Sequence, residues 1–334
     1  MRFLVIGAGR MGARRAELLA SHPEVTELVV ANRRRERAEE VAGRVGGRGV
    51  ALDEAFGTDP DAVVLSLATS LHADYLLAAI GRGLPVLTEK PLALDLAETE
   101  VVVAAALEAG APVQVAFQRR FDPAYLEAAR LVSSGEIGTL YHLNMTARDR
   151  DLTPVELIPG SGGIFRDLHV HDLDAARFLT GQEIVEVYAR ASVRAHPRFA
   201  EHGDFDTATI LATMDDGLTV TICGARHDPV GYDSRVELFG EADSVAVGLS
   251  GRTPLRSLEP GFGHSPPDPY AGFLERFASA FEAETQAFVE LVLGRGPNLC
   301  PPDEAARAMV AAVACERSAA ECRPVTLAEI GTPG

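Results

Sequence analysis

The N-terminal third of the chain alternates short apolar runs with longer segments in which apolar residues recur at helical spacing. The runs are rich in Val, Leu and Ile, and we predict strands at Arg2–Ile6, Glu27–Ala31, Ala62–Leu67, Pro85–Thr88 and Pro112–Phe117. Helices are predicted between them at Arg10–Ala20, Leu71–Arg82 and Leu96–Ala109. Because strands that alternate with helices form right-handed βαβ units, this pattern predicts a doubly wound parallel sheet.

Beyond about residue 122 the strands follow one another more closely. After a predicted helix at Pro123–Ser133, six segments show strand patterning: Thr139–Arg148, Ile184–Val193, Thr207–Met214, Leu218–Cys223, Arg235–Phe239 and Ser244–Gly248. Asp216 and Gly217 separate two of these segments, which predicts a tight hairpin. Strands joined by short turns predict an open, mainly antiparallel sheet and therefore an α+β domain. A loop at Glu259–Pro269 and helices at about Phe273–Leu293 and Asp303–Glu321 complete the expectation.

The length of the chain agrees with two domains. At roughly 150 residues per domain, 334 residues are enough for two separate cores. The change of pattern places the predicted boundary at residue 122, so that residues 1–122 form an α/β domain and residues 123–334 an α+β domain.

Charge and hydropathy exclude several classes of partner. The formal net charge is -17, which repels phosphodiester backbones, so no nucleic-acid partner is expected. The first apolar run ends at Gly7, too early for a signal peptide, and Glu108 interrupts the longest apolar stretch, so no membrane partner is expected. The four cysteines show no paired spacing, and reduced thiols are expected. These features predict a cytoplasmic protein.

The first strand is followed by Gly7-Ala8-Gly9-Arg10-Met11-Gly12, which has the spacing G-x-G-x-x-G. Gly7 permits a tight turn, Gly9 lets the backbone approach a pyrophosphate, and Gly12 allows the helix to pack closely on the strand. The helix that opens there offers N–H groups and a positive dipole end to phosphates. Strand, turn and helix together predict a Rossmann domain that binds a dinucleotide.

The end of the second strand bears on which dinucleotide binds. A carboxylate there hydrogen-bonds the ribose 2′-hydroxyl of NAD, but this chain has Asn32, followed by Arg33 and Arg34. An amide does not repel a 2′-phosphate, and a guanidinium pairs with one, so we predict that NADP is preferred over NAD. The alternative is that the arginines are only the solvated start of a helix.

Two further segments carry candidate chemistry. Glu89-Lys90-Pro91 follows the strand Pro85–Thr88 and so lies at the carboxyl edge of the sheet, where ligands of such sheets bind. Lys90 is suited to hydrogen-bond a substrate hydroxyl and stabilise an alkoxide. The second segment begins at Gly162-Gly163 and continues as a helix predicted from about Ile164 to a C-cap at Gly181.

On that predicted helix Asp167 and His171 are four residues apart and share a face, with Asp174 three residues beyond. A carboxylate beside an imidazole orients it and raises its pKa, which suits a proton acceptor near neutral pH. The alternatives are an ordinary polar helix face and a zinc site. His169 points off this face, so we expect it to tolerate substitution better than His171. Too few ligands remain for zinc, and no metal is predicted.

With these pieces in order, the chain resembles the glucose-fructose oxidoreductase/inositol dehydrogenase/rhizopine catabolism (Gfo/Idh/MocA) family over nearly its full length. The matching pieces are Gly7–Gly12, Ala68–His72, Glu89–Pro91, Gln118–Asp122 and the segment Gly162–Asp174. The resemblance implies a Rossmann domain joined to an open-sheet α+β domain, whose outer sheet face forms a subunit interface. We therefore expect a homo-oligomer, either a dimer or a tetramer.

The likeness is strongest to the inositol dehydrogenase branch, and it implies roles for individual residues. The catalytic Lys, Asp and His of that branch fall on Lys90, Asp167 and His171. The residues implied in cofactor binding are Gly7, Gly9, Arg10, Met11, Gly12, Asn32, Arg33, Ala68, Thr69, His72, Glu89 and Lys90. Two departures are Asn32, where NAD-preferring members have an acidic residue, and Ser161, where the family often has a third glycine.

The expected activity is hydride transfer between a nicotinamide dinucleotide and a secondary alcohol or ketone of a cyclic polyol or sugar. His171 would accept the hydroxyl proton, Asp167 would orient the imidazole, and Lys90 would polarise the reacting oxygen. A catalytically silent sensor that binds dinucleotide or sugar is the alternative, but such a protein has no need of Lys90 and His171. Which polyol is bound does not follow from fold and chemistry alone.

Overall fold

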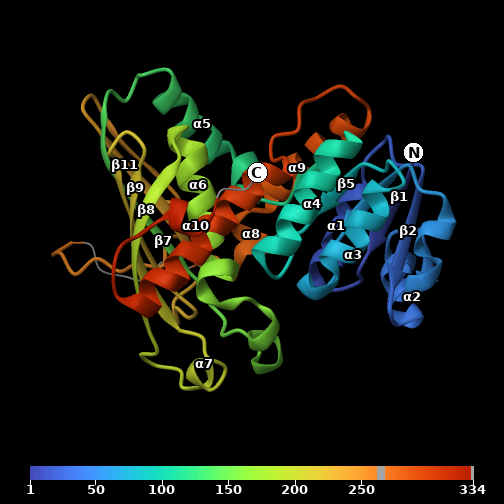
Figure 1. The fold of residues 1–334 in the computed structure, drawn as a ribbon, viewed down its shortest axis with the longest axis horizontal. Coiled ribbons are helices and arrows are strands. Elements are labelled where there is room, and N and C mark those ends of the chain that lie inside the picture. Colours follow the sequence, from blue (N-terminus) through green and yellow to red (C-terminus); the bar gives the residue numbers. More distant parts are fainter. Residues whose placement is uncertain (262–267, 332–334) are drawn as a thin grey trace. The chain divides into compact units, whose positions relative to one another are not determined.

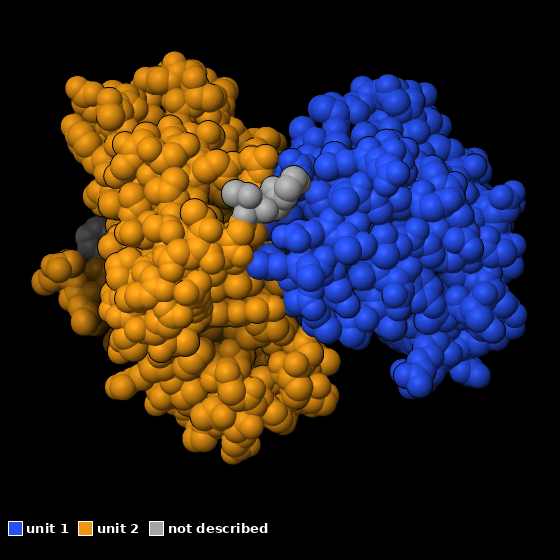
Figure 2. Space-filling view, in the orientation of Figure 1, with its two compact units in different colours: residues 1–117, 281–306, 333–334 blue, residues 118–280, 307–332 orange. Residues whose placement is uncertain are grey.

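A computed structural model describes residues 1–261 and 268–331 (Figure 1). The chain forms two compact units (Figure 2). Unit 1 contains Met1–Phe117 and Phe281–Ala306, and unit 2 contains Gln118–Ala280 and the described residues from Arg307 onward. The predicted domain division at residue 122 stays a prediction. The compact units differ from it in that Phe281–Ala306 returns to the N-terminal unit.

Unit 1 is built on a six-stranded parallel sheet of order β3-β2-β1-β4-β5-β6. The strands are β1 Arg2–Ile6, β2 Glu27–Asn32, β3 Arg48–Ala51, β4 Ala62–Leu65, β5 Val86–Thr88 and β6 Val113–Val115. Phe3–Ile6 of β1 are all fully buried, as expected for a central parallel strand with helices on both faces. This order reverses between β1 and β4, and it confirms the predicted doubly wound Rossmann sheet.

The helices of unit 1 alternate with its strands, and one of them has a clear cap at each end. They are α1 Arg10–Ala20, α2 Arg35–Arg44, α3 His72–Ile80 and α4 Leu96–Ala109, together with most of α9 Ala278–Val292 and the first residues of α10 Pro302–Glu321. At the start of α4 the Asp95 carboxylate accepts a hydrogen bond of 2.9 Å from the Glu98 N–H, and Gly110 ends the helix in the left-handed conformation.

The C-terminal segment of unit 1 completes its core. Phe288 of α9 packs edge-on against Phe3 of β1, with ring centroids 6.1 Å apart. The N–H of Val115 in β6 donates to the Cys300 carbonyl at 2.8 Å. These contacts explain why a segment far along the chain belongs to the N-terminal unit.

Unit 2 is built on a seven-stranded sheet of order β12-β11-β7-β10-β9-β8-β13. The strands are β7 Leu140–Arg148, β8 Ile184–Ser192, β9 Thr207–Met214, β10 Thr219–Ala225, β11 Asp233–Gly240, β12 Ser244–Val247 and β13 Val325–Thr326. β7 and β10 are parallel, and all other pairs in this sheet are antiparallel. The sheet is therefore mainly antiparallel, as predicted, and β9 and β10 form the predicted hairpin at Gly217.

Helices cover one face of this sheet, where α5 Pro123–Ser133, α6 Val170–Thr180 and the later part of α10 lie together (Figure 1). Along β9 the residues alternate between buried Ala208, Ile210, Ala212 and Met214 and more exposed residues such as Thr209 and Leu211. The alternation shows one covered face and one open face within the unit. Two short helices, α7 Arg198–Glu201 and α8 Phe273–Arg276, complete the unit, and residues 262–267 of the predicted loop Glu259–Pro269 lie outside the described residues.

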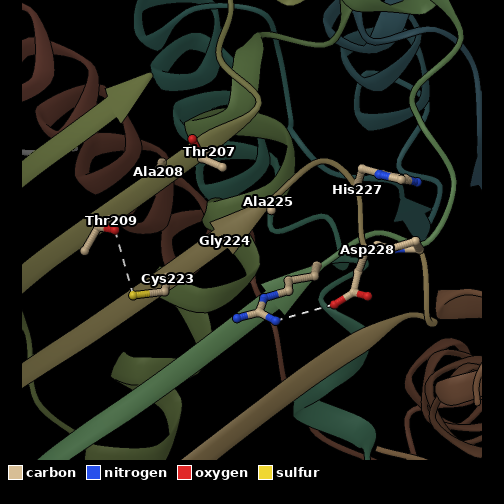
Figure 3. A pocket seen from close by; sticks show the side chains of 10 residues that line it. Thr207, Ala208, Thr209, Cys223, Gly224, Ala225, His227 and Asp228 are labelled. Atoms are coloured by element: carbon tan, nitrogen blue, oxygen red, sulfur yellow. Dashed lines mark hydrogen bonds and ion pairs between the residues drawn. The ribbon is translucent and has the colours of Figure 1, made fainter. Parts of the chain in front are cut away.

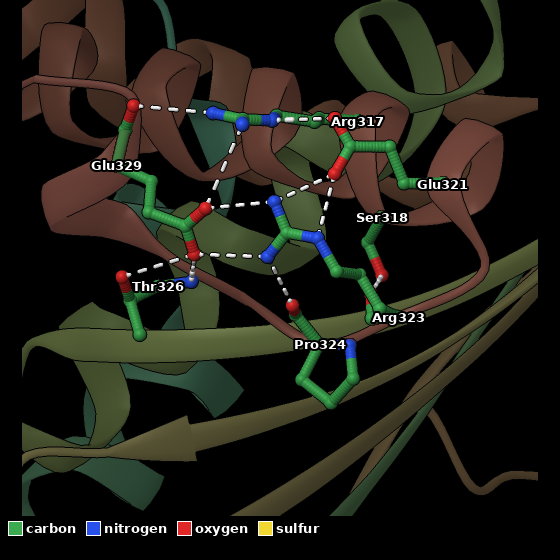
Figure 4. Close-up of polar contacts among 7 residues, drawn as sticks. All are labelled: Arg317, Ser318, Glu321, Arg323, Pro324, Thr326 and Glu329. Atoms are coloured by element: carbon green, nitrogen blue, oxygen red, sulfur yellow. Dashed lines mark hydrogen bonds and ion pairs between the residues drawn. The ribbon is translucent and has the colours of Figure 1, made fainter.

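The last strand, β13, is fixed at the edge of the sheet by a polar network (Figure 4). The Arg323 guanidinium contacts the Glu329 carboxylate at 2.8 Å and the Glu321 carboxylate at 2.6 Å. The Ser318 hydroxyl of α10 donates to the Arg323 carbonyl at 2.6 Å. These contacts tie a two-residue strand to the helix that precedes it.

Candidate active site

The glycine-rich turn has the geometry that its sequence predicts. Gly7 has φ of 108°, and a Cβ there would lie 2.3 Å from the Ser66 carbonyl oxygen. A Cβ on Gly12 would lie 1.8 Å from the Gly7 carbonyl oxygen. A Cβ on Gly9 would meet nothing within 4 Å. The first and third glycines are therefore required by packing, whereas the second borders open space.

That open space fits a dinucleotide phosphate. Gly9 is the N-cap of α1, and no side chain caps the helix there. A helix N-terminus of this kind favours an anionic acceptor for its first-turn N–H groups. The residues present therefore fit the pyrophosphate of a nicotinamide dinucleotide, which Gly7–Gly12 would hold.

Asn32 lies at the end of β2 and braces this turn. Its Oδ1 accepts a hydrogen bond of 3.2 Å from the Ala8 N–H, and its Nδ2 donates to the Arg34 carbonyl at 3.1 Å. Arg37 adds a second brace, since its Nε donates to the Ala8 carbonyl at 3.0 Å. Arg33 is exposed beside this arrangement. The amide thus supports the phosphate-binding turn in addition to facing the position where a ribose would lie in such folds.

The remaining predicted cofactor residues share one edge of the sheet. Because β1, β4 and β5 are neighbouring parallel strands, the turns that follow them lie at the same edge. These turns carry Gly7–Gly12, Ala68–His72 and Glu89–Pro91 respectively. Unit 1 therefore collects the predicted cofactor residues at the carboxyl edge of its sheet, and Lys90 lies there half-buried.

His72 joins two of these turns. Its Nδ1 lies 2.7 Å from the Pro91 carbonyl oxygen and its Nε2 lies 3.1 Å from the Leu67 carbonyl oxygen. Burial lowers the pKa of this imidazole, although both carbonyl contacts oppose the shift. Since both ring nitrogens face backbone oxygens, His72 acts on the cofactor site by holding the Glu89–Pro91 turn in place.

A buried charge cluster that the sequence did not reveal lies beneath Glu89. Arg15 of α1 is fully buried, and its Nε and Nη2 donate to Glu89 Oε1 at 3.0 and 2.9 Å. Its Nη2 also lies 2.5 Å from a carboxylate oxygen of Glu284 in α9. Burial raises the pKa of Glu284 to about 7, with Arg15 opposing the shift. Arg15 thereby connects the phosphate-binding helix to the turn that carries Lys90.

In unit 2 the segment that carries Asp167 and His171 differs from the predicted helix in one respect. Phe165–His169 forms a π-helical turn, and α6 begins only at Val170. A π turn bonds residue i to i+5, so the four-residue spacing of Asp167 and His171 crosses a wider turn than an α-helix provides. Such turns occur frequently at functional sites. The shared face of Asp167 and His171 stays a prediction.

Asp167 is held by an arginine from another strand. Arg226 follows β10, is 1% exposed at its side chain, and its Nη1 donates to Asp167 Oδ2 at 2.6 Å. The second terminal nitrogen lies 3.3 Å from Asp204 Oδ2. Asp167 itself keeps 34% of its side chain exposed, so it remains open to a ligand. Arg226 and Asp204 were not predicted from the sequence.

His169 is part of the core and not a free surface residue. Its side chain is fully buried, and its Nδ1 donates to Asp172 Oδ2 at 2.9 Å. Burial alone would raise the pKa of Asp172, but Arg119 and His169 hold it at about 2. A Cβ on Gly224 of β10 would lie 2.2 Å from the imidazole, so the ring fills the space left by that glycine. The expectation that His169 tolerates substitution better than His171 stays a prediction for turnover, and the burial of His169 adds an expected loss of stability.

A second buried pair explains Asp174. Its carboxylate accepts from Arg120 Nη2 at 2.7 Å and from Nε at 3.0 Å, with both side chains almost fully buried. With the Arg119–Asp172 pair, this contact docks Gln118–Phe121 onto α6. Asp174 thus has a packing role, and the same is true of Asp172.

Replacing His169 with alanine should lower the free energy of unfolding by about 1–3 kcal/mol, because Asp172 loses a buried hydrogen-bond donor. His202→Ala is the matched control, since His202 is exposed in the same unit. Chemical denaturation of both variants measures the effect. Equal stability of the two variants would show that the buried contact contributes nothing.

A cavity of about 360 Å³ lies over the open face of the unit 2 sheet (Figure 3). Its lining comes from β7, β9, β10 and the turn after β10: Arg148, Thr207, Ala208, Thr209, Cys223, Gly224, Ala225, His227, Asp228 and Pro229. Arg148 and Asp228 form an ion pair of 3.4 Å at its rim. Neither Asp167 nor His171 is among these lining residues, so this cavity is separate from the predicted catalytic side chains.

Metal-ligand clusters and membrane-spanning helices are both absent from the described part of the chain. Within residues 1–261 and 268–331, no three His, Cys, Asp or Glu side chains gather as metal ligands. In the same ranges, every helix is too short or too polar to span a membrane.

Comparison with known proteins gives matches along the whole chain. A family model described as "Oxidoreductase family, NAD-binding Rossmann fold" matches residues 1–117, and one described as "GFO/IDH/MocA C-terminal domain" matches residues 125–246. The chain is 35% identical over 329 residues to myo-inositol dehydrogenase Hyg17 of Streptomyces leeuwenhoekii, covering 96% of this chain and 97% of that protein. It is 34% identical to scyllo-inositol 2-dehydrogenase (NAD(+)) of Bacillus subtilis, covering 87% of this chain and 86% of that protein.

Solved structures give the same result. A myo-inositol dehydrogenase from Corynebacterium glutamicum has a TM-score of 0.89 and 35% sequence identity, with 98% of each chain covered. The likeness therefore extends over both units.

Proposed function

Because the chain belongs to the Gfo/Idh/MocA family of oxidoreductases, we propose that it is an NAD-dependent dehydrogenase that oxidises a secondary alcohol of an inositol. The observation that carries this proposal is the likeness to a myo-inositol dehydrogenase at 35% identity over 96% of the chain. The matched relatives named above are all oxidoreductases of inositols, and none of them supports the alternative of a silent sensor.

Three side chains carry the chemistry in this proposal. His171 accepts the proton of the substrate hydroxyl as its C–H bond breaks, and Asp167 orients the imidazole for that transfer. Lys90 donates a hydrogen bond to the same oxygen and stabilises negative charge that develops on it. The nicotinamide, when bound, supplies the hydride acceptor, and Gly7–Gly12 fix its pyrophosphate at the start of α1.

Oxidation of candidate substrates tests this proposal. The intact protein is mixed with NAD or NADP and with individual inositols, hexoses and sugar acids, and the absorbance of the reduced nicotinamide is followed. We expect reduction with at least one inositol and with NAD. Dinucleotide binding without reduction by any polyol would favour the sensor instead.

NAD is proposed as the cofactor in place of NADP. The preference for NADP predicted from Asn32 and Arg33 is not supported by the relatives, since the Bacillus subtilis enzyme is named for NAD and the matching family model is described as NAD-binding. The brace from Asn32 to Ala8 and Arg34 gives the amide a role that does not involve a 2′-phosphate.

Replacing Asn32 with aspartate should increase the preference for NAD over NADP. A carboxylate still accepts from the Ala8 N–H and accepts from the ribose hydroxyls, but it repels a 2′-phosphate. We expect the dissociation constant for NADP to rise at least tenfold, which is about 1.4 kcal/mol, with little change for NAD. Calorimetry with each dinucleotide measures this. A parent protein that binds NADP more tightly than NAD would contradict the proposed cofactor.

The open face of the unit 2 sheet is proposed to form a homo-oligomer. Its strands expose apolar side chains such as Tyr188 and Leu211, which lie directly opposite each other on β8 and β9. A sheet with helices on only one face leaves the other face to be covered by a second copy. Light scattering at micromolar concentration should give at least a dimer, and replacing both residues with lysine should lower the mass. A monomeric mass for the parent would contradict this.

The predicted cytoplasmic location is kept as part of the proposal. It rests on the spacing of the four cysteines in the sequence, which shows no paired pattern.

A further inference from the structure

Arg226 lies next to Asp167, one of the proposed catalytic residues, but has no role in the proton transfer or hydride transfer described above. It lies immediately after β10, at the point where the apolar strand ends, and its side chain is 1% exposed. Its guanidinium contacts two carboxylates from different segments, Asp167 at 2.6 Å and Asp204 at 3.3 Å. A buried arginine between two aspartates needs both of them, because an uncompensated buried charge is strongly destabilising.

We propose that Arg226 is a positioning residue for the dehydrogenase reaction, and that it fixes Asp167 as an ionised carboxylate that orients His171. The inference rests on the proposed function, because it assigns a role relative to Asp167 and His171. In this proposal His171 alone accepts the proton, because the Asp167 carboxylate is paired with a guanidinium and is therefore a poor proton acceptor near neutral pH.

The arginine is itself held from several directions. Its backbone N–H donates to the Asp206 carbonyl at 2.8 Å, and its guanidinium lies 6.0 Å from the centre of the Phe199 ring. Asp206 in turn accepts three backbone N–H groups, from Arg194, Ala195 and His196. The loop after β10 is therefore fixed through the backbone of Arg226 as well as through its guanidinium.

Asp204, the second carboxylate that contacts Arg226, connects this arginine to the π-helical turn. Asp204 Oδ1 accepts from the Ile164 N–H at 2.8 Å, directly before Phe165–His169. A Cβ on Gly163 would lie 3.1 Å from the same oxygen, and φ at Gly163 is 79°, so this residue must be small. Arg226 therefore holds both the start of the turn, through Asp204, and the side chain that the turn presents, Asp167.

The charges around the guanidinium determine the sign of the expected pH effect. Burial lowers the pKa of Arg226, but Asp167, Asp204 and also Asp149 outweigh it, so the pKa is raised and the side chain stays protonated. Glu316, paired with Arg166 at 2.5 Å, is the other carboxylate whose field reaches Asp204. Removing Arg226 leaves this region more negative. A more negative surrounding raises the pKa of an imidazole, so the acid limb of the rate profile should move to higher pH.

The test compares Arg226→Met and Arg226→Lys with a matched control, Arg177→Met. Arg177 lies on α6, is almost as buried as Arg226, and contacts Glu183 with two nitrogens at 2.7 Å, so its loss removes a comparable ion pair of a buried arginine from the same unit. For each variant we would measure kcat/KM against pH with NAD and an inositol, the Kd of NAD, the melting temperature, and the His171 titration by NMR. The His171 signal is assigned from its loss in His171→Ala.

For Arg226→Met we expect kcat to fall at least tenfold, the acid limb and the His171 titration to move up by about one pH unit, and the Kd of NAD to stay within twofold. Arg226→Lys should give smaller changes of the same sign, because it keeps the charge but not the two-carboxylate contact. Arg177→Met should lower the melting temperature without moving either pH midpoint. If Arg226→Met does not fold, Arg226→Lys and its pH profile carry the test.

A double-variant cycle separates this inference from the proposed function. With Asp167→Asn already in place, Arg226→Met should lower kcat/KM by less than threefold further, because the two residues act through one carboxylate. Unmoved pH midpoints in Arg226→Met, or additive losses in the cycle, would overturn the positioning role while leaving the dehydrogenase intact. Full activity in Asp167→Asn and His171→Ala would instead overturn the proposed site. The NMR titration needs no turnover, so it tests Arg226 even then.

Discussion

Replacing His171 with alanine should lower kcat by at least a hundredfold. General acid-base catalysis is worth about a hundred- to ten-thousandfold, or roughly 3 to 5 kcal/mol of barrier, when the proton acceptor is removed. His171 is half-buried near the start of α6, next to the π-helical turn that presents Asp167. The loss should appear in kcat, with the Kd of NAD and the melting temperature close to those of the parent, since the proposed site for NAD is the glycine-rich turn of unit 1.

His202→Ala is the control for this experiment, because His202 is an exposed histidine of the same unit. His169→Ala is unsuitable, since its buried contact with Asp172 makes it a stability variant. Asp167→Asn should lower kcat less than His171→Ala, because it disturbs the imidazole without removing it. Unchanged turnover in His171→Ala would remove His171 from the mechanism.

Replacing Gly9 with valine should abolish dinucleotide binding and leave the fold intact. Gly9 has φ of -75° and ψ of -167°, an extended conformation that any residue adopts, so valine introduces no backbone strain. An added Cβ meets no protein atom within 4 Å, and the side chain would instead fill the space into which the helix N-terminus opens. The pyrophosphate could then no longer approach the backbone.

The control for Gly9→Val is a glycine with equally open surroundings but no link to the phosphate site. Gly57 meets this condition, as a Cβ there also finds nothing within 4 Å. Calorimetry should show no heat of NAD binding for Gly9→Val and ordinary binding for Gly57→Val, with similar melting temperatures. NAD affinity that is unchanged in Gly9→Val would show that the phosphates bind elsewhere.

Elements with clear end signals were predicted from the sequence with correct limits. α1, α4 and α5 have the predicted bounds, and in the structure the Asp95 and Asp122 side chains cap the last two. The elements that were missed give weak or short signals. α2 buries Ala38, Val41 and Ala42, which recur at helical spacing but stand among many charged residues, and β13 has only two residues, too few for a periodic pattern.

The candidate site was predictable only where its chemistry is local in the chain. Gly7–Gly12 lie within one turn, so spacing alone indicated their role. Arg15 and Glu284 are brought together by the return of α9 to unit 1, which no local pattern records. Arg226 and Asp167 likewise meet only because β10 and the π-helical turn pack together. A charged residue at the end of an apolar strand was the one available signal for Arg226.

The surroundings of His169 could not be predicted from its spacing. Spacing places it off the face of His171 but does not say what it packs against. The structure places it against the sheet, because Gly224 leaves room for the imidazole against β10. The two histidines therefore have different surroundings for a reason that lies on another strand.

The most direct test of the account is transfer of deuterium from substrate to cofactor. An inositol that carries deuterium on its ring carbons is incubated with NAD and the parent protein, and the reduced nicotinamide is examined by mass spectrometry. Each reduced cofactor should gain one deuterium. The His171→Ala variant should form this deuterated cofactor at least a hundredfold more slowly than the parent protein. Bound NAD that remains oxidised, or reduced cofactor that contains no deuterium, would contradict the account.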